Sequence, residues 1–228
     1  MEYQEPKIIH MTYGKFNPPT IGHGLIFEML VRQSEDEGGD IGIFTSAKKL
    51  DKKKTFLTPN QKIEALKGHF AVKYPDIQNV RFGYDNIATI LRELNEEYDV
   101  INFYVGTDRA AGAKGGFGWV TDRYENVVLR EPVGIERNER HAVSGDPTHI
   151  SSTLIRKEAS LEHWDIVHRN LLEMPDEIKS KIIAILEKAV PKARGKKRRK
   201  TKKYNKKYNK KHNNISRKRY KRRSKKNH

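Results

Sequence analysis

Short apolar runs alternate along the chain with longer segments whose apolar residues recur every three or four positions. The short runs have the length of buried strands, and the longer segments have the period of helices with one buried face. Alternating strands and helices predict a parallel sheet with right-handed crossovers. The predicted strands cover residues 7–13, 41–45, 80–82, 100–105 and 126–129.

Capping residues mark where the predicted helices begin. The first helix begins near Thr20, after a turn of Gly, Pro and Asn residues over 14–19. Thr58, Pro59 and Gln61 have the order of an N-cap, a proline at the first helical position and a capping-box partner. Asn86 is the expected cap of the next helix.

Beyond residue 150 the pattern is helical throughout. The predicted helices cover 152–159, 161–172 and 175–189. We therefore expect an α/β fold: a Rossmann-like, doubly wound, five-stranded parallel sheet with a helical C-terminal part from about residue 152. In such sheets ligands bind beyond the carboxyl ends of the strands.

Charge divides the chain into two parts. The formal net charge is +17, yet residues 192–228 contain 21 Lys and Arg and no Asp or Glu. The preceding 191 residues hold 25 basic and 29 acidic side chains, a formal charge of −4. We expect a folded domain over 1–190 and a disordered Lys/Arg-rich tail over 191–228, because the tail has too little apolar content to fold alone.

Several function classes are excluded by composition and motifs. The chain has no cysteine, which excludes disulfides, thiolate zinc sites and cysteine nucleophiles. No apolar run approaches the roughly 18 residues of a spanning helix, so no membrane partner is expected. The polar N-terminus is unlike a signal peptide, and we expect an intracellular, cytoplasmic protein. A GxxxxGK[ST] phosphate-binding loop is also absent.

The first candidate site is YGKFNPPTIGH, residues 13–23, where the first strand passes into the first helix. Gly14 would let the backbone approach a ligand closely, and Lys15 lies just past the strand end. The helix beginning near Thr20 would direct its amide groups at the same place, with His23 in its first turn. These features predict a phosphate site. The alternative is an ordinary Gly/Pro turn followed by a surface histidine.

The second candidate site is HISSTLIRK, residues 149–157. Consecutive hydroxyls on Ser151, Ser152 and Thr153 can cap a helix and donate to phosphate oxygens. Arg156 lies one turn after Ser152, so both side chains could face one ligand. The Arg156 guanidinium could then bind the triphosphate of that ligand. The alternative is a simple N-cap with a surface arginine.

Together, GKFNPPTIGH and ISSTLIR resemble the paired (T/H)xGH and ISSTxxR signatures of the HxGH-motif nucleotidyltransferases, which share a cytidylyltransferase-like fold. The resemblance covers roughly residues 7–172. It implies that Arg156 binds the β- and γ-phosphates and that His23 stabilises the α-phosphate in the transition state. Thr20 replaces the first histidine of the motif and keeps a hydroxyl donor. The implied catalytic residues are His23, Thr20 and Lys15, and the implied ATP-binding residues are Gly14, Phe16, Gly22, Ser151, Ser152, Thr153 and Arg156.

The mechanism that the resemblance implies needs no general base. A phosphate monoester has a second pKa of about 6 and is already an anionic nucleophile near neutral pH. The protein must align two anions and offset the charge that builds on the α-phosphate. ATP would be the substrate, with Mg²⁺ bound through its triphosphate.

The acceptor is predicted from the residues after the fourth strand. Gly106 and Asp108, with Trp119 downstream in a glycine-rich loop, are similar to the acceptor site of nicotinamide mononucleotide adenylyltransferases. There an aromatic residue stacks on the pyridine ring, although Trp119 could equally anchor a loop. The ISST…R form favours ATP over CTP, and Thr20 argues against a phosphopantetheine adenylyltransferase. Cytidylyl transfer and phosphopantetheine as acceptor stay as alternatives. Lysines 48, 49 and 52–54 could meet the acceptor phosphate or form a solvated loop.

The basic tail is expected to bind nucleic acid or another polyanion. It is also compatible with a nuclear or nucleolar address or with packing in a virion. A rival hypothesis is therefore a nucleic-acid-binding or virion-packaged protein with an inactive transferase scaffold. The intact His23 and Arg156 favour an enzyme, and the sequence leaves open whether it forms a homo-oligomer.

Overall fold

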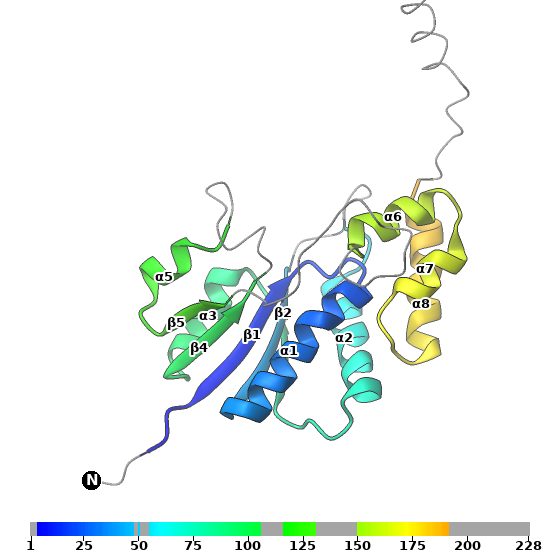
Figure 1. Ribbon diagram of the computed structural model, residues 1–228. Helices are drawn as coiled ribbons and strands as arrows, with labels where there is room; N and C mark the ends of the chain where they lie inside the picture. Colours follow the sequence, from blue (N-terminus) through cyan, green and yellow to red (C-terminus); the bar gives the residue numbers. More distant parts are fainter. Residues whose placement is uncertain (1–3, 48–49, 51–54, 106–115, 131–149, 192–228) are drawn as a thin grey trace, which may run out of the picture. The chain divides into compact units, whose positions relative to one another are not determined.

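The computed structural model describes residues 4–47, 50, 55–105, 116–130 and 150–191 (Figure 1). The chain divides into two units, 1–192 and 193–228. The second unit lies outside the described residues, as does the predicted basic tail beyond Pro191.

The sheet has five parallel strands in the order β3-β2-β1-β4-β5. This confirms the predicted five-stranded parallel sheet, and each strand lies within one or two residues of its expected bounds. The strands are β1 (Ile8–Gly14), β2 (Asp40–Thr45), β3 (Val80–Tyr84), β4 (Val100–Tyr104) and β5 (Val127–Arg130).

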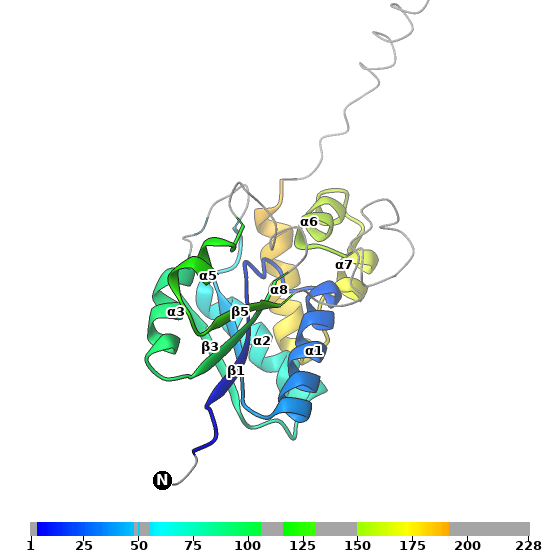
Figure 2. The same cartoon turned by 60° about the vertical axis from the view of Figure 1, so that its left-hand side comes forward.

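Helices cover both faces of the sheet, as a doubly wound fold requires (Figures 1 and 2). One buried cluster joins α1 (Ile21–Glu37) and α2 (Pro59–Lys73) to one face. A second cluster joins α3 (Ile87–Asn95) and α5 (Trp119–Arg123) to the other. Because the strand order reverses between the neighbouring strands β1 and β4, a crevice is expected at the carboxyl ends of these two strands.

Three further helices pack in the same cluster as α1 and α2 (Figures 1 and 2): α6 (Ser152–Ser160), α7 (Trp164–Asn170) and α8 (Asp176–Ala189). They confirm the helical C-terminal part. The helix predicted over 161–172 is shorter than expected, because Leu161 ends α6 and Glu162 has a left-handed backbone with φ of 62°. That residue separates α6 from α7.

Local capping explains why two helices begin where the sequence predicts. The Thr58 hydroxyl accepts from the Gln61 N–H at 3.2 Å, and the Gln61 side chain accepts from the Thr58 N–H at 2.9 Å. Asn86 accepts from the Thr89 N–H at 3.0 Å. By contrast, α5 lies where a glycine-rich loop was expected, and Trp119 is its first residue. With five residues, this helix is too short to show a hydrophobic period.

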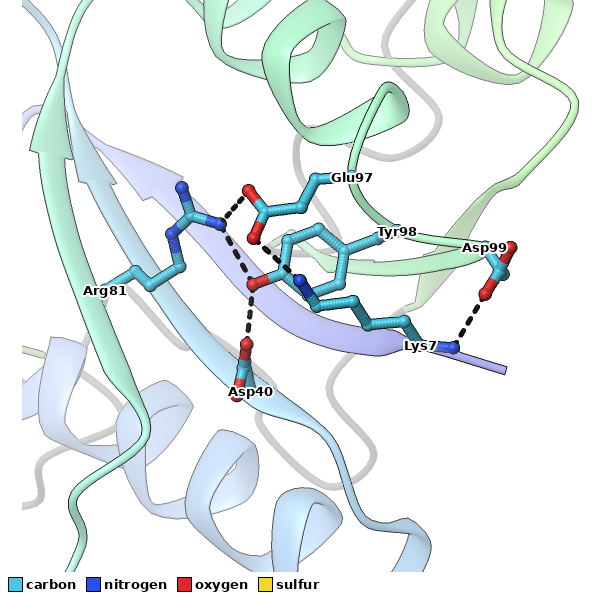
Figure 3. A network of polar contacts seen from close by, with 6 residues as sticks. All are labelled: Lys7, Asp40, Arg81, Glu97, Tyr98 and Asp99. Carbon is cyan, nitrogen blue, oxygen red and sulfur yellow. Dashed lines mark hydrogen bonds and ion pairs between the residues drawn. The ribbon is translucent and has the colours of Figure 1, made fainter. Parts of the chain in front are cut away.

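A polar network ties together the amino ends of four strands, at the edge opposite the expected crevice (Figure 3). The Tyr98 hydroxyl donates to Asp40 at 2.6 Å and accepts from Arg81 at 3.0 Å. Glu97 accepts from both Arg81 and Lys7. Cations also lie over the Tyr98 ring, with the Lys7 Nζ 4.7 Å from its centroid. The network joins these strands at the end of the sheet opposite the expected crevice.

Two buried histidines predict a loss of stability in acid. His10 is fully buried and His69 is 4% exposed; their rings bond to the carbonyls of Gly38 and Glu173, respectively. Burial lowers the pKa of both below the ordinary value of 6.5. As the pH falls below 6.5, the unfolded chain therefore binds protons that the folded protein does not, and the free energy of unfolding decreases.

Urea titrations at about pH 7.5 and about pH 5.5 measure this decrease. His69→Gln keeps a donor for the Glu173 carbonyl and does not titrate. The free energy of unfolding of this variant should therefore decrease less between the two pH values than that of wild type. An equal decrease in the free energy of unfolding of wild type and variant would show that His69 does not contribute to the loss of stability in acid.

Candidate active site

The carboxyl ends of β1 and β4 open onto a pocket of about 700 Å³. It lies at the switch point that the strand order predicts. The turn after β1 and the first turns of α1 and α6 meet there, together with residues just before α2, after β4, before α5 and after α8. The lining residues are Thr12, Tyr13, Gly14, Lys15, Phe16, Asn17, His23, Ile26, Phe56, Val105, Phe117, Ser151, Ser152, Thr153, Arg156, Lys157, Ser160, Val190 and Pro191.

The turn after β1 has a fixed and tightly packed conformation. Phe16 has φ of 40°, and its ring folds back over Gly14. A Cβ on Gly14 would come within 2.7 Å of that ring, so any larger residue would force the Phe16 ring to move. The Asn17 side chain accepts from the N–H groups of Phe56 and Leu57 at 3.1 and 2.9 Å. This turn therefore holds its shape before any ligand binds.

His23 is oriented by the residue that caps its own helix. The Thr20 backbone N–H donates to His23 Nδ1 at 3.0 Å. Because an N–H group can only donate, Nδ1 is the unprotonated nitrogen, and the proton of the neutral ring lies on Nε2. The Thr20 hydroxyl lies 2.9 Å from the same Nδ1 and 3.4 Å from the Ile150 carbonyl. His23 lines the pocket, and its Nε2–H is therefore a donor whose orientation Thr20 fixes.

The second motif is bonded directly onto the first. The Ser152 hydroxyl donates to the Pro18 carbonyl at 2.7 Å. The Arg156 guanidinium donates to the Asn17 carbonyl at 2.6 Å and to the Thr153 hydroxyl at 3.0 Å. Ser151 caps α6 by accepting from the Leu154 N–H. Segments more than 130 residues apart therefore form one wall of the pocket.

The pocket suits an anionic ligand. Lys15, Arg156 and Lys157 line it, whereas none of its described lining residues is Asp or Glu. Burial lowers the pKa of Arg156, but an arginine stays charged in proteins. Within the part of the chain that the structure describes, no three His, Asp or Glu side chains are grouped to hold a metal ion.

A family model described as cytidylyltransferase-like matches residues 11–158. The match begins within β1 and ends within α6, so it includes both motifs and most of the sheet. The chain belongs to the cytidylyltransferase-like family of nucleotidyltransferases. No curated protein sequence matches it.

Solved structures resemble this nucleotidyltransferase in fold. Nicotinic acid mononucleotide adenylyltransferase of Plasmodium falciparum, complexed with NaAD, aligns with a TM-score of 0.50 and 15% identity. That alignment covers 80% of this chain and 98% of the other. NadR protein in complex with NR aligns with a TM-score of 0.45 and 18% identity, over 75% of this chain and 44% of that one.

The nucleotidyltransferase pocket contains most of the predicted site residues. Those that line it are Gly14, Lys15, Phe16, His23, Ser151, Ser152, Thr153 and Arg156. Thr20 is fully buried behind His23, and neither Thr20 nor Gly22 lines the pocket.

The predicted acceptor residues are only partly described. Trp119 is 38% exposed and does not line the pocket, whereas Phe117, two residues earlier, does. Gly106, Asp108 and lysines 48, 49 and 52–54 lie outside the described residues. Their predicted roles stay predictions.

Sequence reasoning missed other lining residues. Asn17 stood inside the first motif and could have been included, because a buried amide is a good turn anchor. Lys157 follows Arg156 directly, and Ser160 lies one turn further along α6. Phe56, Phe117, Val190 and Pro191 carry no signal in the sequence, because only the tertiary fold brings them to the pocket.

Regarding membranes, none of the helices within the described ranges is long and apolar enough to cross a bilayer.

Proposed function

We propose that this nucleotidyltransferase transfers AMP from ATP to a phosphorylated small molecule, with nicotinamide mononucleotide as the acceptor. The products would be NAD and pyrophosphate. The observation that supports this most is that both motifs meet in one basic pocket whose described lining contains no acidic residue. Such a pocket suits two anionic substrates.

In the proposed step, an oxygen of the acceptor phosphate attacks the α-phosphorus of ATP. The bond from the α-phosphorus to the oxygen that bridges to the β-phosphate breaks, and pyrophosphate leaves with that electron pair. No proton has to be removed, because the acceptor is already an anion. Nε2–H of His23 would donate to the α-phosphate oxygens, and Arg156 would bind the leaving β- and γ-phosphates.

Magnesium does not fit as an ion held by the described protein groups. The described lining of the pocket contains no carboxylate, and Mg²⁺ prefers carboxylate and phosphate oxygens. We therefore propose that Mg²⁺ arrives bound to the triphosphate of ATP.

Nicotinamide mononucleotide is proposed on the aromatic side of the pocket. Phe117 packs edge-on against Tyr13, with ring centroids 6.2 Å apart, and both line the pocket. Trp119, two residues after Phe117, begins α5. The proposed acceptor contacts are Gly106, Asp108 and Trp119.

Pyrophosphate release by the full chain tests the proposal. The first mixture contains ATP, Mg²⁺ and nicotinamide mononucleotide, and NAD is identified as the product. A panel then replaces ATP by CTP, and the acceptor by phosphopantetheine or other phosphate monoesters. NAD formation with ATP supports the proposal, and turnover with another pair replaces the proposed substrates. No turnover with any pair would favour the rival hypothesis of an inactive scaffold.

Segment 192–228 is proposed to bind nucleic acid or other polyanions. Its 21 basic residues, with no acidic one, would release condensed counterions, so the affinity should fall linearly on a log–log scale with salt. A chain that ends at Pro191 is expected to lose this binding while keeping pyrophosphate release. Fluorescence anisotropy of a labelled oligonucleotide at several salt concentrations measures the affinity. Salt-dependent binding that survives the truncation would assign it to the folded domain instead.

A further inference from the structure

Lys62 of α2 is a fully buried lysine close to the pocket wall. Its Nζ donates to the Ser46 carbonyl at 3.2 Å, just past the end of β2. Within the described residues the ammonium has no other hydrogen bond and no carboxylate partner. An ammonium has three donors, so the described part of the chain leaves most of its capacity unused.

Ser46 adds a second unsatisfied group at the same place. This residue is 6% exposed, and its hydroxyl has no hydrogen-bond partner among the described residues. The Ser46 backbone N–H donates to the Gly14 carbonyl at 3.3 Å, and the Thr45 hydroxyl donates to the Lys15 carbonyl at 3.4 Å. Lys62 and Ser46 therefore stand directly behind the turn that carries the pocket residues Gly14 and Lys15.

Among the described residues alone, this arrangement is unfavourable without a ligand. A buried charge without a counter-charge loses its hydration and gains little in return. Burial, followed by the nearby charge of Lys15, lowers the pKa of Lys62 to about 8. Groups perturbed in this way gather at functional sites, where a ligand supplies the missing partner.

We infer that Lys62 and Ser46 form the buried half of an anion-binding site whose ligand is a phosphoryl group. The ligand would contact Lys15, which lines the pocket, and would have to reach the Ser46 hydroxyl buried behind the turn, while Lys62 supplies positive charge from behind and fixes the Ser46 backbone. Lys62 is thus a positioning residue. That the phosphoryl group belongs to a substrate rests on the proposed function, whereas anion binding itself does not.

Binding of inorganic pyrophosphate to the full chain, measured by calorimetry without turnover, tests this inference. Lys62→Met removes the charge at similar volume and should weaken binding about 10- to 100-fold, as expected for a charge-assisted contact. Ser46→Ala removes only an unpaired hydroxyl and should weaken binding several-fold. Lys67→Met is the matched control, because Lys67 lies on the same helix and is exposed.

Thermal melting separates a positioning role from a structural one. If the charge is kept for a ligand, Lys62→Met should melt no lower than wild type, and pyrophosphate should raise its melting temperature less. Unchanged affinity with a lowered melting temperature would identify Lys62 as structural and overturn the inference. Should Lys62→Met fail to fold, unchanged affinity of Ser46→Ala would overturn it equally.

Asp51 is the acidic residue nearest to Ser46 along the following segment, and it lies outside the described residues. A double-mutant cycle between Asp51→Asn and Lys62→Met should show additive effects on stability. Strong coupling would reveal an internal counter-charge and overturn the inference. Pyrophosphate binding without turnover on any substrate pair would refute the proposed function alone.

Discussion

Replacing His23 by alanine is expected to lower kcat about 100- to 1,000-fold, the usual cost of losing one donor to transition-state charge. The Thr20 N–H fixes Nδ1 as the acceptor, so the neutral ring carries its proton on Nε2, the proposed donor to the α-phosphate. The ring also packs edge-on against Phe16, with centroids 5.0 Å apart, which restricts its rotation. Because the donor acts on developing charge, kcat should fall more than KM rises.

Steady-state pyrophosphate release by wild type and His23→Ala measures this effect. Thr20→Val is the informative comparison, since it removes the hydroxyl 2.9 Å from Nδ1 but keeps the backbone N–H that orients the ring. Its kcat should fall less than that of His23→Ala. Should His23→Ala keep full kcat with a lowered melting temperature, His23 would have only a helix-capping role through its bond from the Thr20 N–H.

Replacing Arg156 by alanine is expected to lower kcat/KM for ATP by about 100-fold or more, from the loss of a charge-assisted contact to phosphate. Its guanidinium already holds the Asn17 carbonyl and the Thr153 hydroxyl, so its fork is oriented before ATP binds. Lysine keeps the charge but has one nitrogen, and it cannot reproduce these contacts and bind phosphate at once. Arg156→Lys should therefore recover only part of the loss.

Initial rates at varied ATP concentration measure kcat/KM for both variants. Arg169→Ala is the matched control, because Arg169 lies on α7 in an exposed i,i+4 pair with Asp165 and should leave the rate unchanged. An unchanged kcat/KM for Arg156→Ala would contradict a phosphate contact, and full recovery by Arg156→Lys would contradict the role of the oriented guanidinium fork.

Much of the fold could be predicted because its signals are local. Thr58, Gln61 and Asn86 cap their helices through residues three positions apart, which a sequence displays directly. The α5 helix and the break at Glu162 could not be predicted in this way. A five-residue helix shows no period, and a left-handed glutamate depends on packing rather than on its own preference.

The candidate site was predictable where its residues are contiguous in the chain. Lys15, His23 and Arg156 stand within short motifs, and the fold brings them to one pocket. Lys62 was not predicted, because an exposed and a buried lysine look alike within a helical pattern. Thr20 was predicted to act on substrate, which stays a prediction; its buried hydroxyl lies beside His23, a geometry that only the folded helix start reveals.

The bonds from Ser152 and Arg156 to the turn after β1 also bear on synthesis of the protein. A nascent chain on the ribosome completes the turn at Asn17 and Pro18 early, but their partners follow more than 130 residues later. Until α6 has emerged, the growing polypeptide has no complete pocket. Premature release before residue 150 would therefore yield a fragment that retains the first motif but lacks the entire second one.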